Sequence, residues 1–377
     1  MAPYKELSTF FFRRSVEKAF QMDESPSGLS LNMNKAIDSN PPYIVSAVDV
    51  VMYIVNAVIL RSISAAQRGV IDAVIPTISS LLGSDFIGMI QRKMRDESFP
   101  KPLVQGGFPP EDKIVAFIVL INSLDISNEY LSRVVSGVLG TQYEADGRDM
   151  NGAAASIPSS SPLKDSFPFT NDLKDVTARL TTLKMSFSSN TTELLNEGLS
   201  VLFNHVIKPR LRPVLTDTFR DADYGLTEEE VAEMAAQRDQ TEDELLDEVR
   251  RIFGARWEAL MKPIARLMTP RTSGTVLDLT ARYLARVLEK RIWGYAGGRT
   301  SPYGAIRMER DFGAIAGMVS RGNYAVREVF GRTAQILMVA NMEEDEWEEL
   351  EASSDGGGME WVLSEEERRK ARTIVMT

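Results

Sequence analysis

The sequence predicts an all-α fold of long antiparallel helices. Apolar residues recur at steps of three and four along most of the 377 residues, which places them on one face of a helix. No stretch shows the sustained apolar–polar alternation of a half-buried strand, and no Asn-Gly turn joins two β-branched runs. A hydrophobic content of 44% can fill the core of a chain that has room for about two domains.

The first strongly apolar segment, residues 43–60, is at the lower limit of length for a membrane span. Asp49 and Asn56 lie inside it, and an Asp near the centre of a bilayer costs about 2.5–3.5 kcal/mol. The segment therefore predicts a packed core helix, and we expect no transmembrane span. The preceding residues 1–24 mix charged and aromatic side chains, so they do not resemble a signal peptide.

Three longer apolar stripes follow, each with helical spacing. The second stripe runs into an IKPRLRP segment, where Pro209 and Pro213 are predicted to end or kink the helix. The stripes comprise Ile114, Phe117, Ile118, Ile121, Leu124, Leu131, Val134, Val135 and Val138; then Leu173, Val176, Leu180, Leu183, Phe187, Leu195, Leu199, Leu202 and Val206; then Leu277, Ala281, Leu284, Leu288 and Ile292.

Loops and helix starts divide the chain. Residues 145–168 are of low complexity and poor in large apolar side chains, which predicts a mobile loop. The GGRTSPYG segment at 297–304 is the best candidate for a hinge, so we expect a large helical domain at 1–298 and a small one at 299–377. Three capping boxes predict helix starts. They pair Thr227 with Glu230, Thr241 with Glu244, and Ser364 with Glu367.

Composition removes many kinds of chemistry. The chain has no Cys and a single His, His205, which excludes disulfides, thiolate metal sites and His clusters. A net charge of −10 argues against nucleic-acid binding, and no phosphate-binding glycine motif is present. We expect no catalytic residue, no metal site and no cofactor. A carboxylate-dependent helical enzyme stays open as an alternative, because abundant Asp and Glu always allow some pair.

Particular residues carry a family resemblance in their order along the chain. The matching segments are residues 49–55 with Arg61, 84–86 with 93–95, Asn122 with Glu129, 197–199, 207–209 with Pro213, MERDF at 308–312, VREVFGR at 326–332 and WVLSEEE at 361–367. Together they resemble the C-terminal half of the fourth subunit of the conserved oligomeric Golgi complex.

The resemblance implies an elongated rod of antiparallel helical bundles with a small C-terminal helical domain. It also implies a non-enzymatic, peripheral role on the cytosolic face of Golgi membranes. Such a subunit tethers vesicles in intra-Golgi retrograde transport and so keeps glycosylation enzymes in place. Its partners would be the other subunits of the complex, with SNAREs and SNARE regulators. The alternative is a helical subunit of another tethering complex, such as exocyst.

The chain also departs from the family. The N-terminal half, where most SNARE binding is expected, is missing, and the sequence stops at Thr377, before the basic tail usual in the family. Tyr324 stands where relatives look to have Trp, and Gly313 where they have Arg.

In the family, an Arg at the position of Arg332 is held by a Glu matching Glu367, which fastens the last helix to the small domain. Glu367 has a local rival for its carboxylate, since with Ser364 it forms a capping box. Both contacts are compatible if they use different oxygens. The resemblance also suggests a functional surface on the small domain, made of Glu309, Arg310, Asp311, Arg327 and Trp361. The alternative for these five is ordinary solvated charges with Trp361 as a core anchor.

Overall fold

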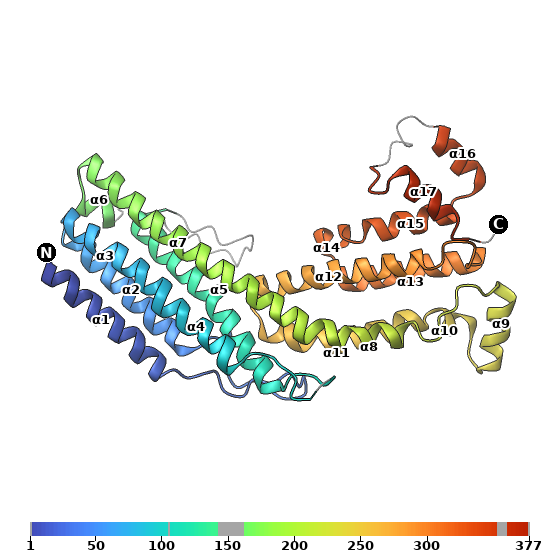
Figure 1. The fold of residues 1–377 in the computed structure, drawn as a ribbon, viewed down its shortest axis with the longest axis horizontal. Coiled ribbons are helices and arrows are strands. Elements are labelled where there is room, and N and C mark those ends of the chain that lie inside the picture. Colours follow the sequence, from blue (N-terminus) through green and yellow to red (C-terminus); the bar gives the residue numbers. More distant parts are fainter. Residues whose placement is uncertain (1, 105, 142–161, 353–359, 376–377) are drawn as a thin grey trace, which may run out of the picture. The chain divides into compact units, whose positions relative to one another are not determined.

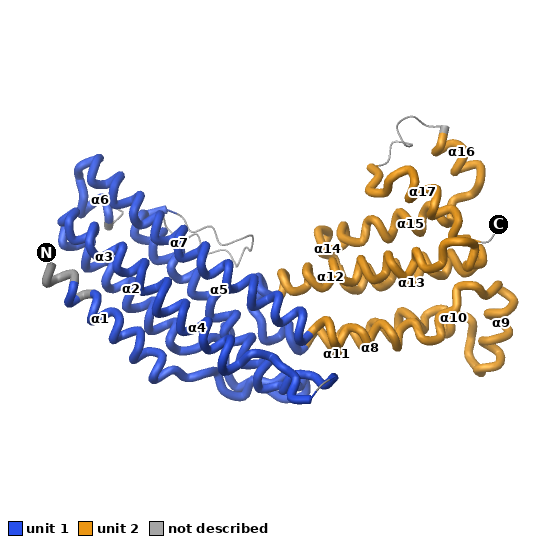
Figure 2. Tube along the Cα trace, in the orientation of Figure 1, with its two compact units in different colours: residues 1–206, 263–272 blue, residues 207–262, 273–377 orange. Residues whose placement is uncertain are grey.

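The computed structural model describes the chain except for residues 1, 105, 142–161, 353–359 and 376–377. The described residues form helices and no strand (Figure 1). An isolated bridge joins Thr300 and Val375. The prediction of an all-α fold is confirmed. The residues group into two compact units, unit 1 at 1–206 with 263–272 and unit 2 at 207–262 with 273–377 (Figure 2).

Unit 1 is a bundle of long helices. Helix α5 packs along α7, α3 packs against both α1 and α7, and α2 contacts α1, α3 and α5. Two π-helical turns, Leu82–Ile87 and Lys93–Glu97, flank α4. The helices are α1 (Ala2–Gln21), α2 (Ser46–Ser64), α3 (Arg68–Leu81), α4 (Gly88–Arg92), α5 (Glu111–Leu139), α6 (Pro162–Ser166) and α7 (Thr170–Leu202).

The first two predicted apolar stripes lie mostly in the core of this bundle, and the third lies on α12 (Pro270–Trp293) in unit 2. The stripe of α5 is buried at Phe117, Ile121 and Leu124, and the stripe of α7 is buried at Leu180 and Leu183. The segment 43–60 forms most of α2, which buries one side of its apolar surface in the bundle.

Among the described residues, three helical stretches are long and apolar enough to cross a membrane, judged by length and composition alone. They are Ser46–Ser64, Arg68–Glu97 and Glu111–Leu139. The share of each apolar window that is buried inside the protein is 44% for the first two and 72% for the third. The absence of a transmembrane span therefore stays a prediction.

Asn122 ties residues 263–272 to unit 1. Its amide nitrogen Nδ2 donates to the backbone oxygens of Leu267 at 2.7 Å and Tyr43 at 3.1 Å. Its Oδ1 accepts from the backbone N–H of Thr269 at 3.1 Å. Because buried backbone groups need partners, one amide side chain satisfies three backbone groups from distant parts of the chain.

Two local expectations differ from the structure. Pro209 and Pro213 do not end the helix: a π-helical turn at Phe203–Ile207 follows α7, and α8 (Lys208–Thr218) continues through both prolines. Pro209 falls in the first turn of α8, where an N–H is dispensable. Most of the predicted loop 145–168 lies outside the described residues, but its last part forms α6, and Leu163 and Phe167 are buried.

Unit 2 contains the remaining helices, except that residues 263–267 of α11 and 270–272 of α12 belong to unit 1. The three predicted capping boxes are confirmed at the starts of α9, α10 and α17. Helix α13 packs against α14 and α15, and α15 packs against α17. Besides α8, the helices are α9 (Glu228–Gln237), α10 (Glu242–Leu246), α11 (Glu248–Leu267), α12 (Pro270–Trp293), α13 (Pro302–Ser320), α14 (Tyr324–Glu328), α15 (Gly331–Asn341), α16 (Glu344–Ala352) and α17 (Glu365–Arg372).

The segment 297–304 is held at both ends instead of forming a free linker. The N–H groups of Gly297 and Gly298 donate to the carbonyl of Thr373 at 2.8 and 2.7 Å. Ser301 Oγ donates to the carbonyl of Leu226 at 2.6 Å, and Gly304 is already inside α13. The boundary expected between residues 298 and 299 thus lies within unit 2. Independent folding of residues 299–377 stays a prediction.

Candidate functional site

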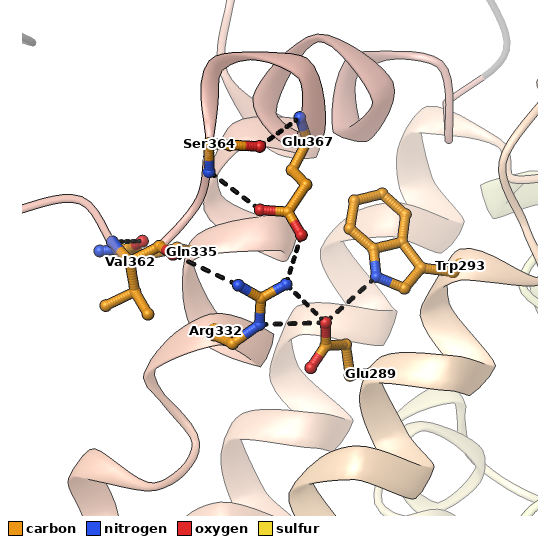
Figure 3. Close-up of polar contacts among 7 residues, drawn as sticks. All are labelled: Glu289, Trp293, Arg332, Gln335, Val362, Ser364 and Glu367. Atoms are coloured by element: carbon orange, nitrogen blue, oxygen red, sulfur yellow. Dashed lines mark hydrogen bonds and ion pairs between the residues drawn. The ribbon is translucent and has the colours of Figure 1, made fainter.

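Arg332, the second residue of α15, joins three helices of unit 2. Its Nε and Nη2 donate to Glu289 Oε1 of α12 at 3.1 and 2.9 Å, and Nη2 also donates to Glu367 Oε1 of α17 at 2.6 Å (Figure 3). Nη1 donates to the carbonyl of Val362 at 3.3 Å. The side chain is 35% exposed, so these charge-assisted bonds form in a partly desolvated place where they are stronger than at an open surface.

Glu367 makes both contacts that the sequence left as rivals. Its Oε1 accepts from Arg332, while Oε2 accepts from the backbone N–H of Ser364 at 2.9 Å. Ser364 Oγ in turn accepts from the backbone N–H of Glu367 at 3.3 Å, which completes the capping box. The bond from Arg332, followed by the bond from Ser364, lowers the pKa of the Glu367 carboxyl to about 2.

Glu289 is the partner that sequence reasoning missed. Its Oε1 also accepts from Trp293 Nε1 at 3.4 Å, one helical turn further along α12. Glu289 raises the pKa of the Arg332 guanidinium more than Glu367 does. The i, i+4 spacing of Glu289 and Trp293 is visible in the sequence, but no pattern links Glu289 to an Arg that lies 43 positions away.

Helix α17 is held to unit 2 by its basic side chains as well as by Glu367. Apolar burial here is small, with Ala371 inside the helix and Ile374 just after it. Three of its basic side chains lie over indole rings, an attraction that strengthens when the pair is shielded from water. They are Arg368 over Trp361 at 4.7 Å, Lys370 over Trp293 at 4.8 Å, and Arg372 over Trp347 at 5.8 Å.

Ion pairs link α17 to the acidic helix α16. Arg369 Nε contacts Glu351 Oε1 at 3.0 Å, and Arg372 Nη2 contacts Glu344 Oε2 at 2.6 Å. The contacts of α17 are therefore mostly electrostatic, and they converge from α12, α15 and α16.

Asp311 does not belong to a surface patch, so that part of the expectation is wrong. It is 3% exposed, and its Oδ2 accepts from the Tyr224 hydroxyl at 2.8 Å. Burial raises the pKa of its carboxyl to about 6. The reason is its position on α13, three residues after buried Met308 and four before buried Ile315.

The other four candidates differ in their surroundings. Glu309 Oε2 accepts from Asn341 Nδ2 at 2.7 Å, and Arg310 Nη2 pairs with Asp247 Oδ1 at 2.5 Å. Arg327 is exposed on α14, and Trp361 is partly buried beneath Arg368. A shared functional surface of Glu309, Arg310, Arg327 and Trp361 stays a prediction.

Elsewhere, the described residues contain no group of three or more His, Asp or Glu side chains that could hold a metal ion. His205 is exposed, and its ring meets Phe99 edge-on at 5.2 Å. A cavity of about 80 Å³ in unit 1 and one of about 20 Å³ in unit 2 are both lined by residues other than Asp311, the carboxyl with the raised pKa.

The fold and this site define a helical-bundle protein in which Arg332, Glu289 and Glu367 fasten helices to one another. Comparison with known families identifies which helical protein it is. The family "Conserved oligomeric Golgi complex subunit 4, C-terminal" matches residues 117–370, and "COG4 transport protein, middle alpha-helical bundle" matches residues 1–94. The chain belongs to the family of conserved oligomeric Golgi complex subunit 4, as its resemblance predicted.

Relatives named conserved oligomeric Golgi complex subunit 4 match most of the chain. The protein of Arabidopsis thaliana is 28% identical over 97% of this chain and 43% of its own length. The Homo sapiens protein is 22% identical over 98% of this chain and 45% of its own length. The Saccharomyces cerevisiae protein is 22% identical over 70% of this chain and 30% of its own length. The chain thus spans less than half the length of these relatives.

Proposed function

We propose that the chain acts as a non-enzymatic subunit of a Golgi vesicle-tethering complex in intra-Golgi retrograde transport. The observation that carries the proposal is the match to a named subunit of the conserved oligomeric Golgi complex over 97% of the chain. Other subunits of that complex would be its partners, with SNAREs and their regulators.

The architecture of each unit supports a mechanical role. Long helices packed along one another make rigid supports, with about 1.5 Å of rise per residue. Several charged groups of unit 2 hold helices together, as in the contacts of Arg332 with Glu289 and Glu367. A scaffold needs such fixed geometry and no reactive group.

Attachment to the cytosolic face of Golgi membranes would be peripheral in this proposal. The apolar helices α2 and α5 would serve as core elements, because their apolar stripes already meet other helices of unit 1. Retention of glycosylation enzymes would follow indirectly, since failed retrograde transport lets them leave their cisternae.

A chimera tests the proposal. The matching region of the Arabidopsis thaliana relative is replaced by this chain, in cells that lack the relative's own copy. We expect the chimera to co-purify with the other subunits of the complex and to restore normal lectin staining of surface glycans. A matched chimera with Arg332→Ala and Glu289→Ala controls for loss of the α15 anchor. A well-folded, expressed chimera that neither co-purifies nor restores glycans would contradict the proposal.

Charge reversal at Arg327 tests the predicted functional surface of unit 2. We propose that Arg327, exposed on α14, contributes to partner binding. Arg327→Glu is expected to leave the thermal unfolding midpoint unchanged and to impair glycosylation in the chimera. Glu366→Lys, a reversal at an exposed position of α17, is the control. Normal glycans with Arg327→Glu would remove Arg327 from the surface.

A further inference from the structure

Helix α1 carries large apolar side chains on two opposite faces, one buried and one exposed. One face, with Phe12, Val16 and Phe20, is buried in unit 1. The other exposes three large apolar side chains, with exposed fractions of 68% for Leu7, 65% for Phe10 and 59% for Phe11. Large apolar groups gathered at a surface are the usual mark of an interaction site.

The exposed residues form one stripe along the helix. Leu7, Phe10, Phe11, Arg14 and Lys18 stand at i, i+3, i+4, i+7 and i+11, which places them within an arc of about 100°. Anchors at i, i+3, i+4 and i+7 are the pattern of one helix docking lengthwise on another. We call this set the outer stripe of α1.

The outer stripe contains cations, and these limit what can cover it. Arg14 and Lys18 are both exposed, and Arg14 Nη1 donates to Glu17 Oε2, at the edge of the stripe, at 3.0 Å. A second copy docked through the same stripe would add another Arg14 and Lys18 and no carboxylate from the five stripe residues, so the cations would lose water without gaining an acidic partner, which is unfavourable. A membrane is also a poor match. Helices that lie on bilayers carry their basic residues on the opposite, polar face, whereas here they lie in line with Leu7 and Phe11.

We propose that the outer stripe of α1 binds an amphipathic helix of a partner protein. Apolar residues of that helix would cover Leu7, Phe10 and Phe11, and two of its carboxylates, one turn apart, would meet Arg14 and Lys18. Charged side chains within an apolar seam fix register and orientation, because only one alignment pairs them. The inference concerns unit 1 alone and holds whether or not the proposed tethering function is correct.

Two synthetic helices test the charge match. Both are peptides of about 20 residues, about 30 Å long when helical, with leucines at i, i+3 and i+4 and two variable positions one turn apart in the same stripe. One peptide carries Glu at both positions and the other carries Lys. We expect fluorescence anisotropy to show at least a tenfold tighter binding of the Glu peptide to the full chain.

Variants locate the binding on α1. Phe10→Ser with Phe11→Ser is expected to abolish binding, and Arg14→Glu with Lys18→Glu to reverse the preference in favour of the Lys peptide. Met185→Ser, at an exposed apolar position of α7, is the matched control and should change nothing. Circular dichroism checks that every variant keeps its helical content.

Several results would overturn the proposal. They are no binding of either peptide, equal binding of both, or binding that survives the Phe10 and Phe11 changes. Sedimentation with phosphatidylserine vesicles that is lost with Phe10→Ser and Phe11→Ser, in the absence of peptide binding, would assign the stripe to a membrane. A dimer lost with the same changes would assign it to a second copy.

Discussion

Arg332 and Glu289 link α15 to α12, because Nε and Nη2 of one guanidinium both donate to Oε1 of Glu289, at 3.1 and 2.9 Å. The same oxygen accepts from Trp293, so Glu289 organises both helices at once. Helix α17 is thus fastened to unit 2 through Arg332, and the main partner of Arg332, Glu289, lies outside the small domain expected at residues 299–377. Glu367 extends this link to α17.

The first prediction is that Glu289→Gln destabilises unit 2 more than Glu367→Gln. Glu289 is the less exposed of the two, with 20% of its side chain accessible against 34% for Glu367. We expect Glu289→Gln to lower the free energy of unfolding by about 1–2 kcal/mol, after discounting for the solvent that reaches Arg332. Urea unfolding of the chain measures it.

A double-mutant cycle assigns the loss to the pair itself. Adding Arg332→Ala to Glu289→Gln should cost less than the sum of the two single changes. Glu366→Gln, at an exposed position of α17, controls for loss of one negative charge. If Glu367→Gln destabilised the chain more than Glu289→Gln, then α17, and not α12, would be the main anchor of Arg332.

Residue spacing predicted the contact of Ser364 with Glu367, the family resemblance suggested that of Arg332 with Glu367, and neither pointed to Glu289. The pairing of Ser364 with Glu367 follows from a spacing of three residues, because a helix start brings those positions together. Glu289 has no such signal, since an ion pair between two packed helices depends on how they meet and not on any period along the chain. Asp311 was recoverable: counting from Met308 in steps of three and four places it in the buried stripe of α13.

Prolines and loops mark the other limit of the sequence. Pro209 and Pro213 were expected to end or kink the helix, but a π-helical turn follows α7 and α8 continues through both prolines. The segment 297–304 has the composition of a hinge, yet contacts with Thr373 and Leu226 hold it in place. Composition indicates how flexible a segment would be in isolation, whereas tertiary contacts determine its conformation in the folded chain.

The second prediction concerns pH. Burial raises the pKa of the Asp311 carboxyl to about 6, from 3.8 for an unperturbed Asp. The folded state therefore binds this proton more tightly, so the contribution of Asp311 to stability is full below pH 3.8 and is lost as the pH rises through 6. At pH 7 the buried charge destabilises the fold by about 3 kcal/mol, to order of magnitude.

Asp311→Asn isolates this effect. Its side-chain oxygen still accepts from the Tyr224 hydroxyl, but no charge forms, so the variant should be more stable than the natural chain at pH 7 and no more stable at pH 4. Thermal unfolding midpoints at a series of pH values measure the difference. Glu367 acts in the opposite direction, because its pKa is lowered to about 2 and its contribution is lost as the pH falls from 4.5 to 2. A pH-independent difference would contradict the prediction.

The third prediction is that Gly304→Ala disrupts the docking of α13. A Cβ at Gly304 would stand 1.8 Å from the carbonyl oxygen of Tyr224, which is backbone and cannot turn aside. We expect destabilisation of about 3 kcal/mol, the upper end for overpacking. Gly313→Ala on the same helix is the control, because no atom lies within 4 Å of its added Cβ; it should stabilise by about 1 kcal/mol. Equal effects of the two changes in urea unfolding would show that the approach to Tyr224 is unimportant.

The fourth prediction is that Asn122→Ala loosens residues 263–272 from unit 1. The change removes the partners of three backbone groups, the carbonyls of Tyr43 and Leu267 and the N–H of Thr269. Unpaired buried polar groups are costly, so we expect a loss of about 2–4 kcal/mol in urea unfolding. The Thr269 amide should also exchange its hydrogen faster, because its acceptor is gone. Asn204→Ala, at an exposed position of the π-helical turn after α7, removes the same side chain without these contacts. If the two variants lose equal stability and Thr269 keeps its protection, water or a shifted backbone replaces the amide, and Asn122 is not what holds the segment.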